Sequence, residues 1–200
     1  MLLITGFDPF GGESINPAWE AVKSLPEEIG PWRLHKMQLP TVFGKAARMA
    51  IEKAECIHPG AILAIGQAGG RKGITPEQVA INLRCANIPD NEGNQPMDLP
   101  IDPEGPAAYF ASLSARSLME AIKAEGIPAS VSYSAGAFVC NDLFYSLLHH
   151  FRDRKLPIDF IHVPYLPQQA GENIPSMPLS DIIRGLTAAI YALPSNKEEK

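Results

Sequence analysis

Apolar runs alternate with amphipathic segments along the chain, and this alternation predicts a fold of strands and helices. The runs "LLITGF" at residues 2–7 and "AILAIG" at 61–66 are short and continuous, as in strands covered on both faces of a sheet. "WRLHKMQL" at 32–39 and "VAINLRC" at 79–85 alternate as strands do, and the second places Cys85 on its apolar side. Two further strands are expected at "ASVSYS", residues 129–134, and at "DFIHVPY", residues 159–165.

The segments between these strands have the apolar spacing of helices. In "NPAWEAVKSLP", residues 16–26, Asn16 can cap a helix and Pro17 fits its first turn. Further helices are expected over residues 41–57 and 105–126, after Cys140, and from about residue 180 onward. Residues 86–106 are rich in Asn, Asp, Pro and Gly, which predicts a long irregular loop, and loops of that length are often functional.

Strands that alternate with helices predict a mostly parallel, twisted central sheet with helices on both faces. We therefore expect an α/β protein with a three-layer α/β/α arrangement, in a single domain that spans residues 1–200. A chain of 200 residues, 46% of them hydrophobic, can bury one sizeable core of this kind. Residues 194–200, at the polar C-terminal end, are expected to fray.

Charge and composition narrow the classes of partner. The net charge of −5 and the lack of a basic run argue against nucleic acid and against an anionic membrane surface. No apolar run approaches the length of a transmembrane helix, and the first residues lack a basic region, so we expect a cytoplasmic protein. The three cysteines, Cys56, Cys85 and Cys140, are widely spaced without a C-x-x-C pair, which indicates neither a disulfide framework nor a metal site.

Cys140 stands where chemistry is expected in such a fold, between a predicted strand and a helix in "SYSAGAFVCNDLFYSLLHH". A helix dipole stabilises a nearby anion by roughly 0.3–1 kcal/mol, which is less than one unit of pKa. A free thiol has a pKa of about 8.5, so a nucleophilic Cys140 also needs a base or a cation. Histidine is the natural supplier.

Of the five histidines, His162 is the best candidate for that base. It lies near the end of the strand "DFIHV", where strand ends lead into site loops, whereas His149 and His150 lie too far along the helix after Cys140. Its position alone is equally consistent with a buried histidine whose ring nitrogens bond to the backbone. A carboxylate usually holds the second nitrogen of a catalytic imidazole, and Glu77 in "GITPEQVAINL" is a candidate, although "TPEQ" can also cap a helix.

The glycine-rich stretches "FGG" at 10–12 and "GQAGGRKG" at 66–73 allow a different function. Glycines followed by Arg71 and Lys72 after a strand can hold a phosphate through backbone N–H groups, as in a phosphate-binding transferase. Neither stretch has the spacing of a Walker loop or a dinucleotide fingerprint. A non-catalytic binding protein on the same fold is the other alternative.

Nearly the whole chain resembles pyroglutamyl peptidase type I, also called pyrrolidone carboxyl peptidase. The resemblance is carried by "TGFDPFGG", "NPAWEAV", "GQAGGRKGITPEQVAINL", "IPDNEGNQP", "SYSAGAFVCNDLFYSLLHH" and "FIHVPYLPQQ". It implies a cysteine exopeptidase that removes the N-terminal pyroglutamyl residue from peptides, with Cys140 as nucleophile, His162 as general base and acid, and Glu77 as the residue that orients the histidine. It further implies no metal or organic cofactor and a homotetramer.

The resemblance also implies a pocket for the neutral lactam ring of the substrate. Its apolar walls would include Phe7, Phe10, Phe138 and Val139, with Gln67 as a polar partner. Without the resemblance, the three phenylalanines could equally be ordinary residues of the hydrophobic core. One departure concerns Gln78, because this family usually has Lys or Arg directly after the glutamate. In an extended segment Gln78 faces away from Glu77, so we expect the departure to be tolerated.

Overall fold

The computed structural model describes residues 1–194, whose centre is a six-stranded sheet in the order β2-β3-β1-β4-β8-β5. The four central strands run parallel, and the two edge strands pair antiparallel with their neighbours. The parallel strands are β1 (Leu2–Phe7), β3 (Trp32–Leu39), β4 (Ala61–Gln67) and β8 (Ile158–Val163). The edge strands are β2 (Glu28–Ile29) and β5 (Thr75–Pro76).

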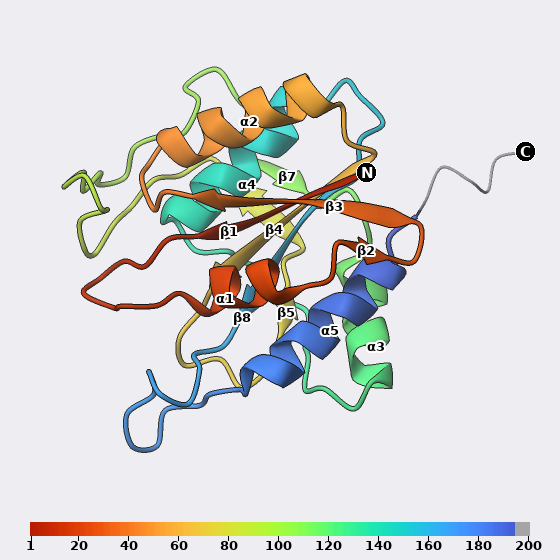
Figure 1. Cartoon of the computed structure of the whole chain (residues 1–200). Helices are drawn as coiled ribbons and strands as arrows, with labels where there is room; N and C mark the ends of the chain where they lie inside the picture. The colour runs from red at the N-terminus through yellow and green to blue at the C-terminus, as the bar shows by residue number, and fades with distance from the viewer. Residues whose placement is uncertain (195–200) are drawn as a thin grey trace, which may run out of the picture.

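Helices cover both faces of this sheet (Figure 1). One layer holds α1 (Pro17–Ser24), α3 (Ala115–Ala124) and α5 (Leu179–Tyr191), and the other holds α2 (Lys45–Ile57) and α4 (Val139–His150). Each layer packs on its own hydrophobic cluster against the sheet. The predicted three-layer α/β fold with a mostly parallel sheet is therefore confirmed. The expected fraying of residues 194–200 falls almost entirely outside the described residues.

Strand alternation decides which side chains reach which layer. In β4, Ile62 and Ala64 belong to the cluster under α2 and α4, whereas Leu63 and Ile65 belong to the cluster under the other three helices. In β8, Ile158 and Phe160 likewise face α2 and α4, and Ile161 and Val163 face the opposite layer. By the same alternation, Gly66 and His162 face the layer that contains α4.

Local sequence explains several helix boundaries. The Asn16 side chain caps α1 by accepting a hydrogen bond from the backbone N–H of Ala18 at 3.0 Å, and Pro17 begins the helix as predicted. The second helix begins four residues later than expected, at Lys45, because Gly44 has a positive φ of 68° and precedes the first helical turn. Among the described residues, no helix is both long and apolar enough to cross a membrane.

The helix expected over residues 105–126 is wrong in its first half. Residues Ala108–Phe110 form strand β7, which pairs antiparallel with β6 (Val79–Ile81), and α3 begins only after Ser114 caps it. The aromatic pair Tyr109-Phe110 favours a strand once a partner strand is present. The strand predicted over residues 79–85 is correspondingly short: the Asn82 N–H still donates to the Ala107 carbonyl, but the Leu83 N–H turns back to the Ile81 carbonyl at 2.9 Å and ends the ladder.

The strand expected at residues 129–134 is also wrong. This segment makes isolated bridges, Ile74 with Ala129 and Glu77 with Ser132, but forms no strand. Pro76 lies between these bridges and has no N–H to donate, so the ladder is interrupted. Residues 86–106 form the irregular loop that their composition predicted.

Asp159 is an unusual buried group in β8. Its side chain faces the layer of α1, α3 and α5, is 2% exposed, and has no cationic partner among the described residues. Burial raises the pKa of Asp159 to about 8, although the backbone of Leu113 partly opposes this. The group is therefore neutral in the folded protein at neutral pH.

This burial predicts a pH dependence of stability. Above about pH 4 the unfolded chain loses the Asp159 proton, whereas the folded chain keeps it up to about pH 8. The contribution of Asp159 to the free energy of unfolding should therefore fall by about 1.4 kcal/mol per pH unit within that window. Urea unfolding should show that Asp159→Asn removes this slope. The control Asp153→Asn, at an 87% exposed side chain, should keep it, and parallel curves for wild type and Asp159→Asn would contradict the assignment.

Candidate active site

The loops that follow the parallel strands gather at one end of the sheet. In Figure 1 the loop after β1, the long loop after β6 and the loop after β8 all lie toward the left of the molecule. The carboxyl ends of parallel strands are where α/β proteins usually place their binding sites. Six of the eight predicted site residues lie on or directly beside β1, β4, β8 and the start of α4 at this end.

Cys140 is the second residue of α4 and is half-buried against β4. Its sulfur lies directly over Gly66, because a Cβ placed on Gly66 would be 2.9 Å from Cys140 Sγ and 2.8 Å from the ring of Phe160. Real Cβ atoms do not approach other atoms this closely, so this spacing between α4 and β4 requires glycine. The absence of a side chain at residue 66 is what lets the thiol approach the sheet.

His162 is the neighbour of Gly66 on the adjacent strand. The two residues are paired in the register of β4 and β8, and neighbouring strands lie about 4.8 Å apart. Since both positions face α4, the imidazole lies beside the sulfur of Cys140. His162 is 3% exposed, so its ring is held by packing on the Phe160 ring at a centroid distance of 4.8 Å.

Glu77 completes a buried cluster with this histidine. It follows the edge strand β5, and its backbone N–H donates to the Phe160 carbonyl at 2.9 Å. Its side chain is fully buried, and its Oε1 lies 2.7 Å from His162 Nδ1. The structure thus brings Cys140, His162 and Glu77 together. The helix-cap alternative for Glu77 is wrong, because the segment is extended.

An arginine makes a further contact with this carboxylate. The Arg71 guanidinium donates from one nitrogen to Glu77 Oε1 at 2.6 Å and to the Thr75 hydroxyl, and from another nitrogen to the Ser134 carbonyl at 3.3 Å. Arg71 lies in the turn after β4, and its side chain is 27% exposed. Its guanidinium is thus bound within the protein, which disfavours the reading of this turn as a phosphate loop.

The electrostatics of the cluster set its resting protonation. Burial opposes ionisation of Glu77, but the hydrogen bond and the charge of His162, with smaller contributions from Ser132 and Arg71, outweigh it, so the pKa of Glu77 lies below its usual value. Burial lowers the pKa of His162 more than Glu77 raises it. Burial, followed by the charge of Glu77, raises the pKa of Cys140 to about 12, and Arg71 opposes this rise. At neutral pH the resting centre therefore holds a thiol, a neutral imidazole and a carboxylate.

The predicted pocket residues divide into two groups. Phe10 and Phe138 are half-buried and adjacent, with ring centroids 5.9 Å apart, so they can offer apolar surface to a ligand. Phe7 and Val139 are almost fully buried in the cluster under α2 and α4, where they pack the base of the site. Phe43, which the sequence did not single out, packs edge-on against Phe138 at 5.2 Å.

Gln67, the polar pocket residue, is held by a second amide. Its Oε1 accepts a hydrogen bond from Gln169 Nε2 at 3.3 Å, and the same nitrogen lies 3.2 Å from the Ile15 carbonyl. The Gln169 Oε1 in turn accepts from the backbone N–H of Leu166. Gln67 therefore has its amide nitrogen left for other partners, whereas its oxygen is engaged.

The long loop at residues 86–106 holds the loops that carry Phe10 and Phe138, the two half-buried phenylalanines. Asn91 donates to the Asp8 side chain at 3.1 Å and to the Pro9 carbonyl at 2.9 Å, just before Phe10. At the start of the loop, the Cys85 backbone N–H donates to the Ala137 carbonyl at 2.9 Å, next to Phe138. The loop thus holds both sides of the apolar surface in place.

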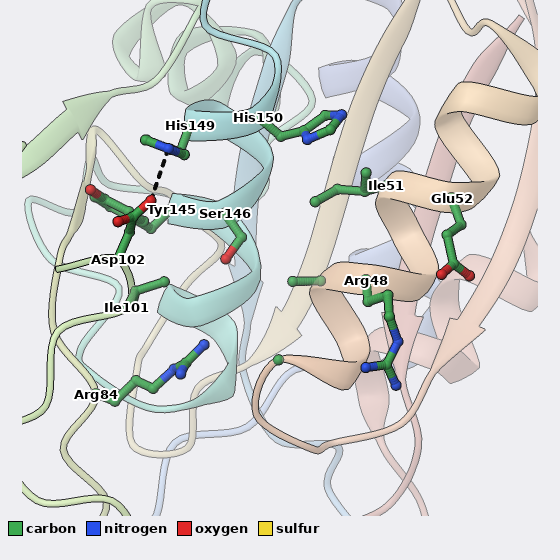
Figure 2. Close-up of a pocket in the computed structure, with 12 residues that line it drawn as sticks. Arg48, Ile51, Glu52, Arg84, Ile101, Asp102, Tyr145, Ser146, His149 and His150 are labelled. Carbon is green, nitrogen blue, oxygen red and sulfur yellow. Dashed lines mark ion pairs between the residues drawn. The ribbon is translucent and has the colours of Figure 1, made fainter. Parts of the chain in front are cut away.

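A separate groove lies between α2 and α4, away from the cluster. Figure 2 shows its lining, which encloses about 370 Å³ and contains none of the eight predicted site residues. Its histidines come from the last turn of α4: His149 pairs with Asp102 at 3.1 Å, drawn as the dashed line, and His150 pairs with Glu55 at 2.9 Å. Neither histidine serves the sulfur of Cys140.

A half-buried cysteine beside a buried histidine that contacts a buried carboxylate, at the carboxyl end of a parallel sheet, is typical of a cysteine hydrolase. Comparison with known proteins gives the family. The model of the pyroglutamyl peptidase family matches residues 1–196, and the chain belongs to this family. The resemblance inferred from the sequence motifs is thereby confirmed, and the chain is a peptidase of the hydrolase class.

Named relatives and solved structures agree over almost the full length. The chain is 52% identical over 196 residues to pyrrolidone-carboxylate peptidase 1 of Caldanaerobacter subterraneus subsp. tengcongensis, covering 96% of this chain and 97% of the relative. The crystal structure of pyroglutamyl peptidase I from Bacillus amyloliquefaciens superposes with a TM-score of 0.90 at 50% identity, covering 94% and 93%. Pyrrolidone carboxyl peptidase from Thermococcus litoralis gives a TM-score of 0.91 at 37% identity, covering 96% and 91%.

Sequence reasoning missed three residues that the structure places in or beside the site. Phe43 lies in the segment predicted to be helical over residues 41–57, and Gln169 lies in a loop with no pattern to mark it. Arg71 was considered only as a phosphate ligand. Its separation of six residues from Glu77 in "RKGITPE" was the available signal, because a long arginine side chain can reach a carboxylate that close along the chain.

The contact between Gly66 and Cys140 generates a prediction. Gly66→Ala would place a methyl group within 3.0 Å of the sulfur and of the Phe160 ring, so α4 or the thiol must shift. A displacement of about 1 Å at a reacting atom can cost roughly 10²-fold, and we expect that order of loss in kcat/KM on a pyroglutamyl amide. Gly171→Ala is the control, because its methyl group would only meet Ile174 at 3.7 Å. Wild-type kcat/KM in Gly66→Ala would show that the site does not depend on this close approach.

Proposed function

We propose that Cys140, His162 and Glu77 form the catalytic triad of this chain and that it removes the N-terminal pyroglutamyl residue from peptides. The observation that carries the proposal is the hydrogen bond between buried His162 and buried Glu77 beside the sulfur of Cys140. Membership in the pyroglutamyl peptidase family supports the substrate class. No metal or organic cofactor is required by this chemistry.

His162 acts as the base for the thiol. Glu77 accepts a hydrogen bond from His162 Nδ1–H, which leaves Nε2 unprotonated and able to take the proton of Cys140. Because burial raises the pKa of this thiol to about 12, its proton has to leave as the sulfur attacks the pyroglutamyl carbonyl carbon. The C–N bond then breaks, and the His162 imidazolium gives its proton to the leaving amine. Water, deprotonated by His162, releases pyroglutamate and regenerates the thiol.

The negative oxygen that develops on the carbonyl needs hydrogen-bond donors. The first N–H groups of a helix have no partner within the helix and carry partial positive charge. Cys140 is the second residue of α4, and its backbone N–H lies against its own sulfur. We therefore assign the oxyanion donors to the first turn of α4, where the attacked carbonyl carbon would meet the sulfur.

The pocket accounts for selection of the lactam over open-chain residues. Phe10 and Phe138 offer apolar surface, Phe7 and Val139 close the base, and the Gln67 amide supplies polar contacts for the ring. An N-terminal glutamyl residue would bring an ammonium and a carboxylate into this setting. Burying an unpaired charge is expensive, so the open-chain form binds poorly in the reactive position.

Two further features stay predictions. We expect a homotetramer, as the family resemblance implies, and a cytoplasmic location. Size-exclusion chromatography with light scattering measures the first, and cell fractionation the second.

The three cysteines differ in a way that allows a direct test of Cys140. Cys56 is exposed and Cys85 is half-buried, so faster labelling of Cys140 by accessibility alone is not expected. Cys140→Ser should lose at least about 10³-fold in kcat, since a serine hydroxyl is a much weaker nucleophile here. Cys56→Ser and Cys85→Ser are matched controls and should keep wild-type kcat. If Cys140→Ser kept its rate, cysteine would have no part in the mechanism.

Substrate selection is tested with three amides that share one fluorogenic leaving group. We expect kcat/KM for the pyroglutamyl amide to exceed that for the glutamyl and glutaminyl amides by at least about 10²-fold, because of the apolar pocket. Phe138→Ala should lower kcat/KM for the pyroglutamyl amide, whereas Phe110→Ala, at a 75% exposed residue of β7, serves as the control. Comparable values for the three amides would refute the pocket.

A further inference from the structure

Glu77 raises a physical problem that the triad alone does not solve. Its side chain is fully buried, and an unpaired buried carboxylate is expensive, so it would take up a proton unless a cation balances it. The neighbouring His162 is neutral in the resting centre, because burial lowers its pKa. Among the described residues, Arg71 is the one lysine or arginine that forms an ion pair with Glu77.

We propose that Arg71 is a positioning residue of the active site: it balances the charge of the Glu77 carboxylate and fixes which way the His162 ring faces. Arg71 and His162 contact the same oxygen, Glu77 Oε1, at 2.6 Å and 2.7 Å. The carboxylate is therefore held from one side by a permanent cation and from the other by the imidazole that it orients. The inference rests on the proposed catalytic roles of Glu77 and His162.

Arg71 is itself fixed by two further contacts. Its guanidinium also bonds to the Thr75 hydroxyl and to the Ser134 carbonyl, which lies six residues before Cys140. It thus connects the turn after β4, the edge strand β5 and the segment that leads into α4. A guanidinium suits such a position, because its donors lie in a rigid plane, whereas a lysine ammonium is a single point of charge.

The charge of Arg71 also acts on the nucleophile. The negative charge of Glu77 raises the pKa of Cys140, and the positive charge of Arg71 lowers it. Without Arg71, the Glu77 carboxylate can respond in two ways, and both impair catalysis. Either Glu77 takes up a proton and no longer stabilises the His162 imidazolium, or it stays charged and raises the pKa values of both His162 and Cys140.

This assignment is consistent with the expectation that the departure at position 78 is tolerated. Gln78 pairs through its backbone with Ser132 and Ala111, beside the buried Glu77. The cation for Glu77 comes from the turn at Arg71, six residues earlier, and not from the residue that follows it. A basic side chain at position 78 is therefore dispensable for the charge balance of the triad.

The test compares Arg71→Gln, Arg71→Lys and the neighbouring control Lys72→Gln. Arg71→Gln should lower kcat on the pyroglutamyl amide by at least about tenfold, with KM changed by less than about threefold, because Arg71 does not line the lactam pocket. The acid limb of kcat/KM should move away from its wild-type position: to higher pH if Glu77 stays charged, because the pKa of His162 then rises, and to lower pH if Glu77 takes up a proton. Arg71→Lys should recover part of kcat, and Lys72→Gln should match wild type.

A second readout needs no peptide substrate. In a Cys56→Ser, Cys85→Ser background, the rate of Cys140 alkylation by iodoacetamide should fall at neutral pH in Arg71→Gln and rise only at higher pH. Arg71 also lines a surface cavity of about 370 Å³ with Lys72, Ser130 and Ser132, which gives solutes access. Millimolar guanidinium should therefore partly restore kcat to Arg71→Gln, whereas the same concentration of sodium chloride should not.

The possible results distinguish a failure of the proposed peptidase function from a failure of the proposed role of Arg71. A wild-type protein without pyroglutamyl hydrolysis refutes the proposed function, and the alkylation profile then still decides the role of Arg71. Hydrolysis that depends on added phosphate would instead favour Arg71 as a phosphate ligand and overturn the inference. Wild-type kcat and acid limb in Arg71→Gln overturn it as well. If Arg71→Gln does not fold, an Arg71→Lys variant that equals wild type in both readouts overturns it.

Discussion

The close approach of α4 to β4 is the constraint on which the rest of the site depends. Because Gly66 has no side chain, the sulfur of Cys140 can lie directly over the strand, beside the residue that is paired with Gly66 on β8. The strand register pairs Gly66 with residue 162, and side-chain alternation turns that residue toward α4. A histidine next to the sulfur therefore has to stand at position 162. The carboxylate follows from the same geometry, because the antiparallel edge strand β5 brings Glu77 diagonally across from that histidine.

Helix α4 is held in this position by the residues on either side of the thiol. Asn141 exchanges hydrogen bonds with the backbone of Ile81 and also donates to the Leu83 carbonyl. Asp142 pairs with Arg84 at 2.6 Å and accepts from the Gly44 N–H at 2.7 Å. Asn141 and Asp142 are both fully buried, so the satisfaction of their polar groups fixes one orientation of the helix. Cys140 is thus positioned by the residues next to it in α4 and not by its own side chain.

The sequence predicted the long strands and the helices well, because burial on two faces and the helical period leave a strong pattern in β1, β4, α1 and α5. It failed at β7 and at residues 129–134, where pairing with distant short strands decides the outcome. The triad residues could be proposed from their types and places along the chain, but position alone left both His162 and Glu77 open, and the family resemblance supplied their pairing. The interpretation of Arg71 as a phosphate ligand failed because composition does not reveal the partner. A glycine-rich turn with basic residues looks the same in sequence whether its cation binds a phosphate or a carboxylate of the protein.

The two edge strands also limit how this protein can associate with other chains. An exposed edge of a sheet presents unpaired N–H and C=O groups, and these can recruit a strand from another molecule. Here the parallel core ends on both sides in a strand of two residues, β2 and β5, and β5 includes Pro76, which has no N–H to offer. Residues 128–132 also cover this edge, where the Ser132 N–H donates to the Pro76 carbonyl at 2.9 Å. The edge next to Glu77 is therefore a poor template for amyloid-like growth.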